Sequence, residues 1–362
     1  MGHRATSSPC AEACAVSWRD ALSTRIACGA DSGRGPDVED AMRVVGYDVP
    51  LRTRFRGLTR RDGLLLHGDA GWAEFSPFWD YDAPESAAWL AAAREAAHTE
   101  YPAPVRDRVP VNVTVPAVGP EDAHRIVTAS GGCTTAKVKV AEANQTLDDE
   151  LARLEAVRDA LGPGGKVRID VNARWDLDTA LHRLPLLDRA AGGLEYAEQP
   201  CTTVEDLATL RRRLTIPIAA DESIRRAADP YRVRDAQAAD VVVLKVQPLG
   251  GVRACLRLAE EIGLPVVVSS ALESSIGLAA GVALAAALPE LHHACGLATA
   301  HLLATDTVAE PLLPVDGHLP VTRPDPAEAA LAAAAQSPEL AARWERRLAG
   351  VTAALDAHGG TR

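Results

Sequence analysis

The sequence predicts an α/β protein in which a parallel βα barrel follows a small α+β lobe. From Val111 onward, β-rich runs alternate with amphipathic helical segments, as in a parallel βα array. Five charged residues, each ending a short apolar run, recur at steps of 31, 28, 23 and 24 residues. These steps are close to the roughly 30 residues of one barrel unit, and strand ends are where such barrels carry their chemistry. The five are Lys139, Asp170, Glu198, Asp221 and Lys245.

Composition narrows the range of partners. The chain has 362 residues, of which 47% are hydrophobic and 24% charged, as in ordinary globular proteins. A net charge of -11 and a pI near 5.4 argue against nucleic acid as the main ligand. No uncharged apolar stretch reaches the about 18 residues of a membrane span. A small-molecule ligand is therefore expected, with neither nucleic acid nor membrane.

The seven cysteines are scattered without a framework and are odd in number. This pattern is typical of reduced thiols in a cytoplasmic protein. Cys10 and Cys14 form the one close pair in the sequence, but no second Cys or His pair follows with zinc-finger spacing. We therefore expect no zinc finger.

Residues 1–41 show no sustained periodicity and are rich in Ala, Ser, Gly and Asp. They lack the apolar region of a signal peptide and the acid-poor composition of a transit peptide. At Met42 the sequence changes abruptly to a strand-like run. We interpret residues 1–41 as a disordered extension and place the start of the folded protein near Met42.

The segment from Met42 to about Tyr101 predicts a small α+β lobe. Its strands are expected at Arg43–Arg54, Gly63–His67 and Gly71–Phe75, followed by a helix at Glu85–Thr99. The aromatic residues gather here, which indicates an aromatic core for the lobe. Alternatively, one of two loops, 56–62 or 76–81, covers a substrate.

The barrel itself is predicted from eight strand candidates and seven intervening helices. The strands are Val111–Val115, Ala136–Val140, Val167–Val171, Leu194–Glu198, Ile218–Asp221, Val241–Val246, Pro265–Ser269 and His292–Gly296. The helices begin near Glu121, Leu147, Leu177, Val204, Ile224, Gly251 and Ile276. A Pro-rich segment and two Ala-rich helical stretches follow.

Two lysines lie two positions apart on one predicted strand, Lys137 and Lys139. Both ammonium groups therefore project to the same side. Neighbouring cations inside a barrel lower the pKa of each other, and a lysine so lowered can remove a proton near neutral pH. The alternative is one buried lysine paired with a carboxylate and a second at the rim.

Acids end the next three strands: Asp170, which Asn172 accompanies, Glu198 and Asp221. Any one of them alone suits a helix cap or a partner of arginine. Three together without a cation would repel one another strongly. Because the ligands are oxygens with no nearby His or Cys, we expect Mg²⁺, with Mn²⁺ as the close alternative.

Lys245 ends the sixth strand, across the barrel from Lys139. A flat reaction centre held between the two lysines would be deprotonated on one face. Ser269 and Ser270 follow on the seventh strand, and 273–275 come next. Their hydroxyls and the following helix N-terminus suit either a substrate carboxylate or ordinary helix capping.

The order Lys-x-Lys, Asp-x-Asn, Glu-Gln-Pro, Asp-Glu-Ser and Lys resembles the enolase superfamily, in particular its muconate-lactonizing subgroup. The resemblance covers roughly Met42 to the end. It implies a modified TIM barrel, (β/α)7β, with an α+β capping domain built from the N-terminal segment and the C-terminal tail. The implied divisions are 42–105 and 301–362 for the cap and 106–300 for the barrel. It also implies Mg²⁺ held by Asp170, Glu198 and Asp221.

Four further stretches, 50–57, 71–78, 168–172 and 269–277, resemble the o-succinylbenzoate synthases of the actinobacterial type. That resemblance implies a lyase of menaquinone biosynthesis, which dehydrates 2-succinyl-6-hydroxy-2,4-cyclohexadiene-1-carboxylate through an enediolate. Lys139 would be the base and then the acid of a syn elimination, and Lys245 would stabilise the enediolate. Supporting and substrate-binding roles would fall to Lys137, Asn172, Ser269, Ser270 and Gly296. One departure is Ala298, where an acidic or small polar residue is expected.

Other reactions fit the same residues. Racemisation of N-succinylamino acids needs a base on each face of the α-carbon, and the same two lysines supply them. Dipeptide epimerisation and muconate cycloisomerisation are the next alternatives. A catalytically silent barrel that acts as a scaffold is the alternative from another class, but it has no reason to keep two lysines and three acids at these strand ends.

Overall fold

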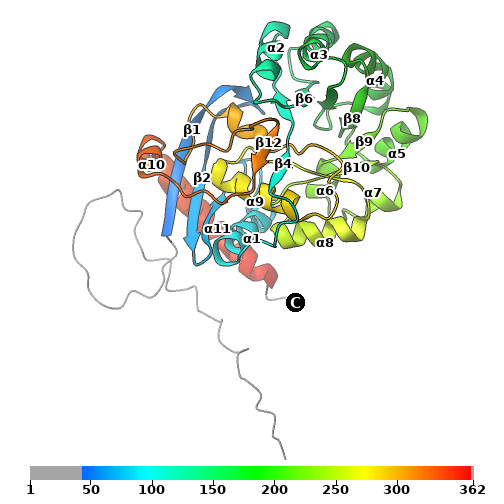
Figure 1. Ribbon diagram of the computed structural model, residues 1–362. Coiled ribbons are helices and arrows are strands. Elements are labelled where there is room, and N and C mark those ends of the chain that lie inside the picture. Colours follow the sequence, from blue (N-terminus) through cyan, green and yellow to red (C-terminus); the bar gives the residue numbers. More distant parts are fainter. Residues whose placement is uncertain (1–42, 360–362) are drawn as a thin grey trace, which may run out of the picture.

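The computed structural model describes residues 43–359, and our interpretation of residues 1–41 and Met42 falls outside this range. Figure 1 shows a sheet with its flanking helices set beside a larger array of strands surrounded by helices. These correspond to the predicted lobe and barrel. Within residues 43–359, no helix combines the length and the apolarity needed to cross a membrane.

The lobe is built on an antiparallel three-stranded sheet, β1 (Arg43–Phe55), β2 (Leu58–Gly68) and β3 (Gly71–Phe75). β1 and β2 are joined by a tight turn in which Arg56 and Gly57 have φ of 53° and 77°, a left-handed conformation that glycine adopts without cost. Helix α1 (Ala83–His98) starts at a capping box between Asp82 and Glu85. The three predicted strands and the helix are thus present, with longer β1 and β2.

The barrel contains a seven-stranded parallel sheet in the order β11-β10-β9-β8-β7-β6-β5. Its strands are β5 (Val113–Val115), β6 (Thr135–Lys139), β7 (Lys166–Asp170), β8 (Leu194–Glu198), β9 (Ile218–Ala220), β10 (Val241–Leu244) and β11 (Val266–Val268). The helices between them are α2 (Pro120–Thr128), α3 (Leu147–Leu161), α4 (Leu177–Ala191), α5 (Val204–Arg213), α6 (Glu222–Arg225), α7 (Arg232–Asp235), α8 (Val252–Ile262) and α9 (Ser275–Ala287).

The eighth predicted strand, His292–Gly296, is wrong as a regular strand. Only two isolated bridges are present there, Cys295 to Val111 and Gly296 to Ser269. These two bridges nevertheless join both edges of the sheet and close the ring. Helix α7 was not predicted, because its four residues are too short to show a periodicity.

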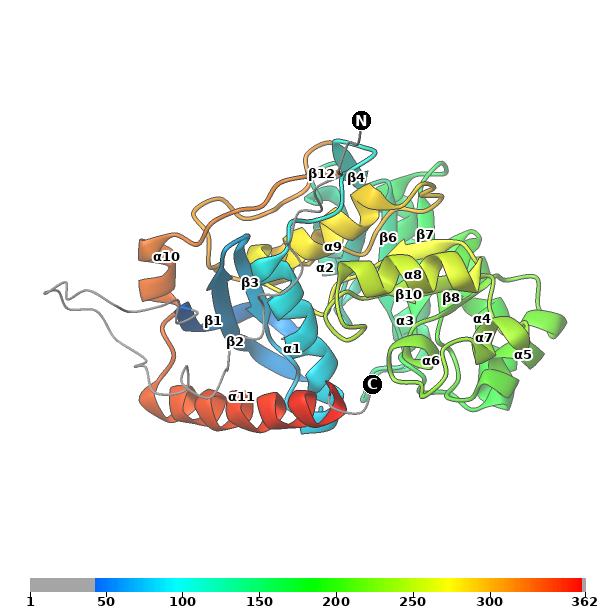
Figure 2. The same ribbon diagram turned by 90° about the horizontal axis from the view of Figure 1, so that it is seen from below.

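The chain then returns to the lobe. The 3₁₀ helix η2 (Ala298–Leu302) leads to β12 (His318–Pro320), which pairs with β4 (Arg108–Pro110). Helices α10 (Glu328–Ala333) and α11 (Pro338–Gly359) follow, and α11 packs against α1 (Figure 2). Trp344 of α11 is fully buried and meets the edge of Phe75 at 5.9 Å between ring centroids.

Alternate strand residues divide the barrel into two cores. Val138, Ile169 and Ala197 belong to the large apolar cluster between strands and helices. Residues of the opposite parity point inward, where Tyr196, Ala219, Val241, Val243 and Val267 form a separate inner cluster. This alternation is what directs charged side chains of the same strands into the barrel at its carboxyl end.

Candidate active site

The carboxyl-end layer of the barrel consists of charged side chains on neighbouring strands. Lys139 of β6 pairs in register with Asp170 of β7, and Asp170 pairs with Glu198 of β8. Asp221 follows β9 and Lys245 follows β10. All five are at most 9% exposed. The structure therefore brings together the five residues that the sequence spacing singled out.

The two lysines of β6 lie against the acids. Lys137 donates to Asp170 at 3.0 Å and to Glu198 at 2.9 Å. Lys139 donates to Asp170 and to the Asn172 Oδ1 atom, both at 2.6 Å. The expectation that neighbouring cations lower both pKa values is wrong for Lys137. Burial lowers its pKa, but the attraction of Asp170 and Glu198 prevails and the net pKa is raised well above the ordinary value.

Across the barrel, Asp221 is held by two cations. Lys245 donates to its Oδ2 atom at 2.6 Å, and Arg225 donates to its Oδ1 atom at 2.9 Å. The pKa of Lys245 is lowered, chiefly by burial. Sequence reasoning missed Arg225, although its position four residues after Asp221 in a helix-initiating segment was a usable signal.

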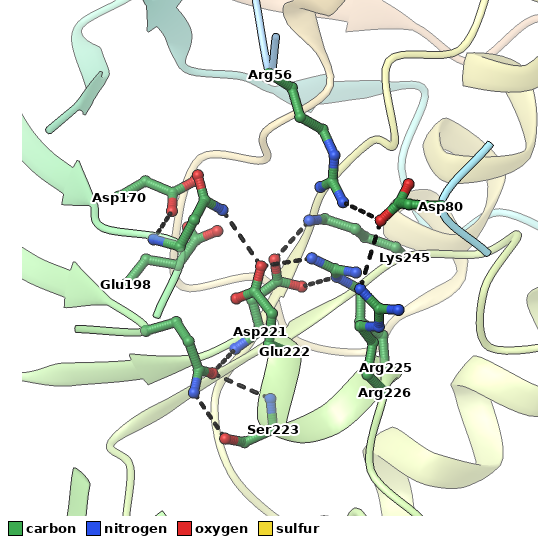
Figure 3. A network of polar contacts seen from close by, with 12 residues as sticks. Arg56, Asp80, Asp170, Glu198, Asp221, Glu222, Ser223, Arg225, Arg226 and Lys245 are labelled. Carbon is green, nitrogen blue, oxygen red and sulfur yellow. Dashed lines mark hydrogen bonds and ion pairs between the residues drawn. The ribbon is translucent and has the colours of Figure 1, made fainter. Parts of the chain in front are cut away.

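Figure 3 shows how this pair continues into the lobe. Arg225 also donates to Glu222 and to the Tyr81 hydroxyl. Its neighbour Arg226 lies 3.6 Å from Asp80, and Asp80 lies 3.7 Å from Arg56. Asp221 is thereby linked through Arg225 to Tyr81 of the lobe, and Arg226 makes a separate contact with Asp80.

The backbone around the acids is strained. Asn172 and Gln199 have φ of 51° and 40°, in the left-handed region that costs a non-glycine residue energy. The Gln199 Oε1 atom accepts the backbone N–H groups of Asp221 at 2.9 Å and Ser223 at 3.1 Å. The amide that follows Glu198 thus fixes the backbone of the next acid.

The three acids differ in pKa. Burial raises the pKa of Asp170, but Lys137 and Lys139 outweigh it and hold the pKa well below its usual range. Burial also raises the pKa of Asp221, but the charges of Arg225 and Lys245 outweigh burial, so the net pKa of Asp221 is lowered. Burial, assisted by the charge of Asp170, raises the pKa of Glu198 to about 7. Glu198 is the least compensated acid of the three.

A cavity opens onto this layer. It is lined by Lys137, Lys139, Asp170, Asn172, Arg225 and Lys245 from the barrel and by Phe55, Arg56, Phe78, Tyr81 and Trp89 from the lobe, with Ser270, Ala271, Leu272 and Thr299 at its side. Its volume is ≈ 50 Å³, against about 300–1,000 Å³ for ligand pockets. The cavity as it stands is therefore smaller than ligand pockets of that kind. A larger cavity of ≈ 410 Å³ between β1 and α2 contains neither these lysines nor these acids.

Both segments predicted as covering loops contribute to the lining, Arg56 from one and Phe78 and Tyr81 from the other. The first is wrong as a loop of that length, because residues from Leu58 onward belong to β2. Ser270 also lines the cavity and shares a hydrogen bond of 2.7 Å with Thr299, a residue that sequence reasoning missed. Ser269 and Gly296 lie together beneath the lining, 3.4 Å apart between hydroxyl and carbonyl.

The serines at the start of α9 are occupied by the protein's own acids. Ser274 donates to Glu74 of β3 at 2.5 Å, and Ser275 donates to Asp306 at 2.7 Å. The backbone N–H groups of Ser274 and Gly277 donate to Glu74, and that of Ser275 donates to Asp306. The expected capping by serine hydroxyls is therefore wrong, because Ser274 makes no side-chain cap hydrogen bond and acids of the protein bind this helix N-terminus.

The donor set suits a hard divalent cation. Asp170, Glu198 and Asp221 supply only carboxylate oxygens, from adjacent strand ends, and all are buried. As the side chains stand within residues 43–359, no group of three acids, histidines or cysteines is arranged to hold a metal ion. The physical reason is visible in the contacts: the carboxylate oxygens face Lys137, Lys139, Lys245 and Arg225. Metal binding requires these ion pairs to yield.

Fold and site together define a class, the capped (β/α)7β barrels. Enolase C-terminal domain-like sequences match residues 120–326, and Enolase N-terminal domain-like sequences match residues 46–97. Among solved structures, 2-chloromuconate cycloisomerase from Rhodococcus opacus superposes with a TM-score of 0.68 at 24% identity, covering 82% of this chain and 98% of that one.

Two relatives define the group more closely. The o-succinylbenzoate synthase of Thermobifida fusca strain YX is 67% identical over 310 residues, 86% of this chain and 96% of the relative. That of Mycolicibacterium smegmatis is 52% identical over 310 residues, 85% of this chain and 94% of the relative. The chain belongs to the o-succinylbenzoate synthases of the enolase superfamily.

Proposed function

We propose that this chain dehydrates 2-succinyl-6-hydroxy-2,4-cyclohexadiene-1-carboxylate to o-succinylbenzoate as a lyase of menaquinone biosynthesis. The observation that carries the proposal is the placement of Lys139, which ends β6, and Lys245, which follows β10, in the lining of one cavity together with Asp170. The 67% identity to the Thermobifida synthase supports the choice of substrate.

Lys139 is the proposed base and acid. Its Nζ atom removes the proton from the carbon that bears the ring carboxylate, and the electron pair of that C–H bond forms the enediolate. Collapse of the enediolate expels hydroxide from the adjacent carbon, and Lys139 returns the proton so that water leaves on the same face. The 2.6 Å contacts of Lys139 with Asp170 and Asn172 support this role, because they fix the ammonium group after protonation.

The other side chains hold charge in place. The Lys245 ammonium stabilises the enediolate from the opposite face. Lys137, buried between Asp170 and Glu198, stays cationic and orients both acids. Asn172 supports Lys139, and Ser270, with Ser269 and Gly296 behind it, lies toward the succinyl tail.

Mg²⁺ is the proposed cofactor, held by Asp170, Glu198 and Asp221, with Mn²⁺ as a substitute. When bound, it supplies positive charge that stabilises the oxygens of the enediolate. Charge balance supports this: four acids, the three ligands and Glu222, already face four cations, Lys137, Lys139, Lys245 and Arg225. A divalent cation leaves two positive charges for a substrate with two carboxylates.

We also infer the domain division 42–105 and 301–362 for the cap and 106–300 for the barrel. The packing of α11 on α1 supports it. A cytoplasmic location is proposed from the cysteines, because Cys133, Cys201, Cys255 and Cys295 are all buried free thiols.

The direct test is the loss of the cyclohexadiene chromophore with purified full-length chain, with and without EDTA. We expect turnover that EDTA abolishes and added Mg²⁺ restores. Absence of turnover with saturating Mg²⁺ would refute the proposed reaction.

Racemisation of N-succinylamino acids is the second candidate, because Lys139 and Lys245 lie on different sides of one cavity. The two reactions are distinguished by using NMR to follow the incorporation of deuterium from D₂O at the α-carbon of an N-succinylamino acid. Exchange without dehydration of the cyclohexadiene would favour the racemase, and dehydration without exchange would favour the synthase.

A further inference from the structure

The loop that follows β11 forms one wall of the cavity, through Ser270, Ala271 and Leu272. Leu272 has φ of 63°, a left-handed conformation that a leucine adopts only when its surroundings impose it. Ala271 and Leu272 are 7% and 3% exposed and pack into the apolar cluster of the lobe rather than that of the barrel. A barrel loop is thus held in a strained shape by the lobe.

Arg61 of β2 is the lobe residue that holds it. Its Nε atom donates to the Leu272 carbonyl at 3.0 Å, and its Nη2 atom lies 3.4 Å from the Ala271 carbonyl. The same Nη2 donates to the hydroxyl of Ser76 at 2.8 Å and to its carbonyl. The planar fork of the guanidinium thereby ties two consecutive carbonyls of the loop to the lobe.

Arg61 also supports a second part of the wall. Its guanidinium lies over the Phe78 ring, 4.5 Å from the centroid, and Phe78 lines the cavity. Arg61 itself is 2% exposed and is absent from the lining. Among the described residues, no carboxylate lies within ion-pair distance of Arg61, and its direct acceptors are carbonyl and hydroxyl oxygens. The buried acids Glu74, which accepts from the Ser76 hydroxyl, and Glu273 attract its charge at longer range.

We propose that Arg61 is a positioning residue that sets substrate affinity by fixing the Ala271–Leu272 and Phe78 walls of the cavity. The inference rests on the proposed function, because it assigns those walls to the ring and succinyl tail. Arg61 contacts neither the lysines nor the three acids of the barrel. Its loss should therefore affect binding of the organic ligand and leave proton transfer and metal binding intact.

The test compares Arg61→Met with Arg60→Met. Arg60 is the adjacent residue of the same strand, but its side chain is 51% exposed and pairs with Asp48 at 2.8 Å. For Arg61→Met we expect KM for the cyclohexadiene and Kd for o-succinylbenzoate, measured by calorimetry, to rise about tenfold or more, since two buried carbonyls lose their donor. We expect kcat to stay within about threefold and Mn²⁺ affinity to be unchanged. Arg60→Met should match the wild type.

A merely structural role would give a different result. A fall in melting temperature with unchanged KM and Kd in the folded fraction overturns the inference, as does an equal loss of Mn²⁺ affinity. If Arg61→Met does not fold, Arg61→Lys keeps the charge without the fork, and we expect the same selective rise in KM at smaller size. Wild-type chain that neither dehydrates the substrate nor binds the product refutes the proposed function, whatever the variants do.

A double-mutant cycle isolates the strained backbone. Glycine adopts a positive φ freely, so Leu272→Gly removes the strain that Arg61 opposes while keeping the carbonyl. We expect Arg61→Met to raise the product Kd less in the Leu272→Gly background than in the wild type. Equal effects in both backgrounds would contradict the assigned role.

Discussion

The two ends of the barrel each contain a buried ionic cluster, and β7 and β8 carry residues of both. At the carboxyl end, Asp170 and Glu198 accept from Lys137, and Asp170 and Lys137 line a cavity. At the amino end, Arg168 donates to Glu195 at 2.5 Å, stacks on Tyr196 and lines neither of the two cavities described above. We call the cluster of Asp170 and Glu198 with the lysines the open cluster, and the cluster of Arg168 and Glu195 the closed cluster.

Glu195, the acid of the closed cluster, contacts three basic side chains. Besides Arg168, Glu195 accepts from Lys166 at 2.9 Å and lies 3.0 Å from the His293 Nδ1 atom. A β-bulge makes this possible, because β8 gains one residue between the partners of Val167 and Arg168 and so turns Glu195 toward the cluster. The comparison teaches that burial and ion pairing alone do not mark a site. Ion pairs that also line a cavity, as those of Asp170 with Lys137 and Lys139 do, are the better indication of a site.

The largest effect is expected from Lys139→Ala. Removing the proposed base should lower kcat for dehydration by about 10²–10⁴-fold, the usual contribution of general acid–base catalysis. The matched control is Lys166→Ala at the other end, whose side chain is 57% exposed. Steady-state kinetics should show the control within about threefold of the wild type. Full dehydration activity of Lys139→Ala would refute the mechanism.

Glu195→Ala should disrupt the closed cluster at the amino end of the barrel. It leaves Arg168, which is fully buried, without its carboxylate. We expect a loss of about 3–5 kcal/mol in the free energy of unfolding, with KM unchanged in the folded enzyme. Urea denaturation followed by circular dichroism measures this. Glu290→Ala, which removes an exposed partner of His292, should change stability by at most about 1 kcal/mol. Equal stability of the two variants would remove the distinction between the clusters.

Arg225→Gln should have a smaller effect, on the open cluster. Arg225 fixes one oxygen of Asp221, so its loss should lower kcat/KM and Mn²⁺ affinity by about 10–100-fold, as for other groups that orient a metal ligand. Mn²⁺ titration followed by EPR gives the affinity directly. Arg226→Gln is the control, because Arg226 pairs with Asp80 and Glu85 rather than with the acids. Unchanged metal affinity in Arg225→Gln would show that Asp221 needs no such support.

Much of the open cluster could be predicted from the sequence, because strand ends repeat at a regular interval. Each of the five key residues terminates an apolar run, and parallel strands necessarily bring such ends to one face. The closed cluster was not foreseen. Glu195 reaches Arg168 only through a bulge, and a single inserted residue leaves no periodic signal.

The contacts between the lobe and the barrel loop could not be predicted from the sequence either. Arg61 and Leu272 are 211 positions apart, and nothing in the local text of either indicates a partner. The eighth strand failed for a related reason: its pairing consists of two bridges set by the closing of the ring, not by a run of β-forming residues. Periodicity predicts elements and their ends, whereas long-range pairing depends on the assembled fold.

The smallest effect concerns pH and sharpens the comparison from the closed side. Burial raises the pKa of Glu195, but His293 and Arg168 prevail, and the net pKa lies well below the ordinary value of 4.5. Because the folded pKa is depressed, the unfolded chain binds the proton first as pH falls, so the stabilisation is complete above 4.5 and is lost progressively below it. Urea midpoints measured from pH 6 down to about 3 should therefore fall more steeply for the wild type than for Glu195→Gln. Glu290→Gln should keep the wild-type slope, since its carboxylate is exposed. Parallel slopes for all three proteins would mean that the closed cluster contributes nothing to acid stability, and that its ion pairs are no stronger in the folded barrel than in the unfolded chain.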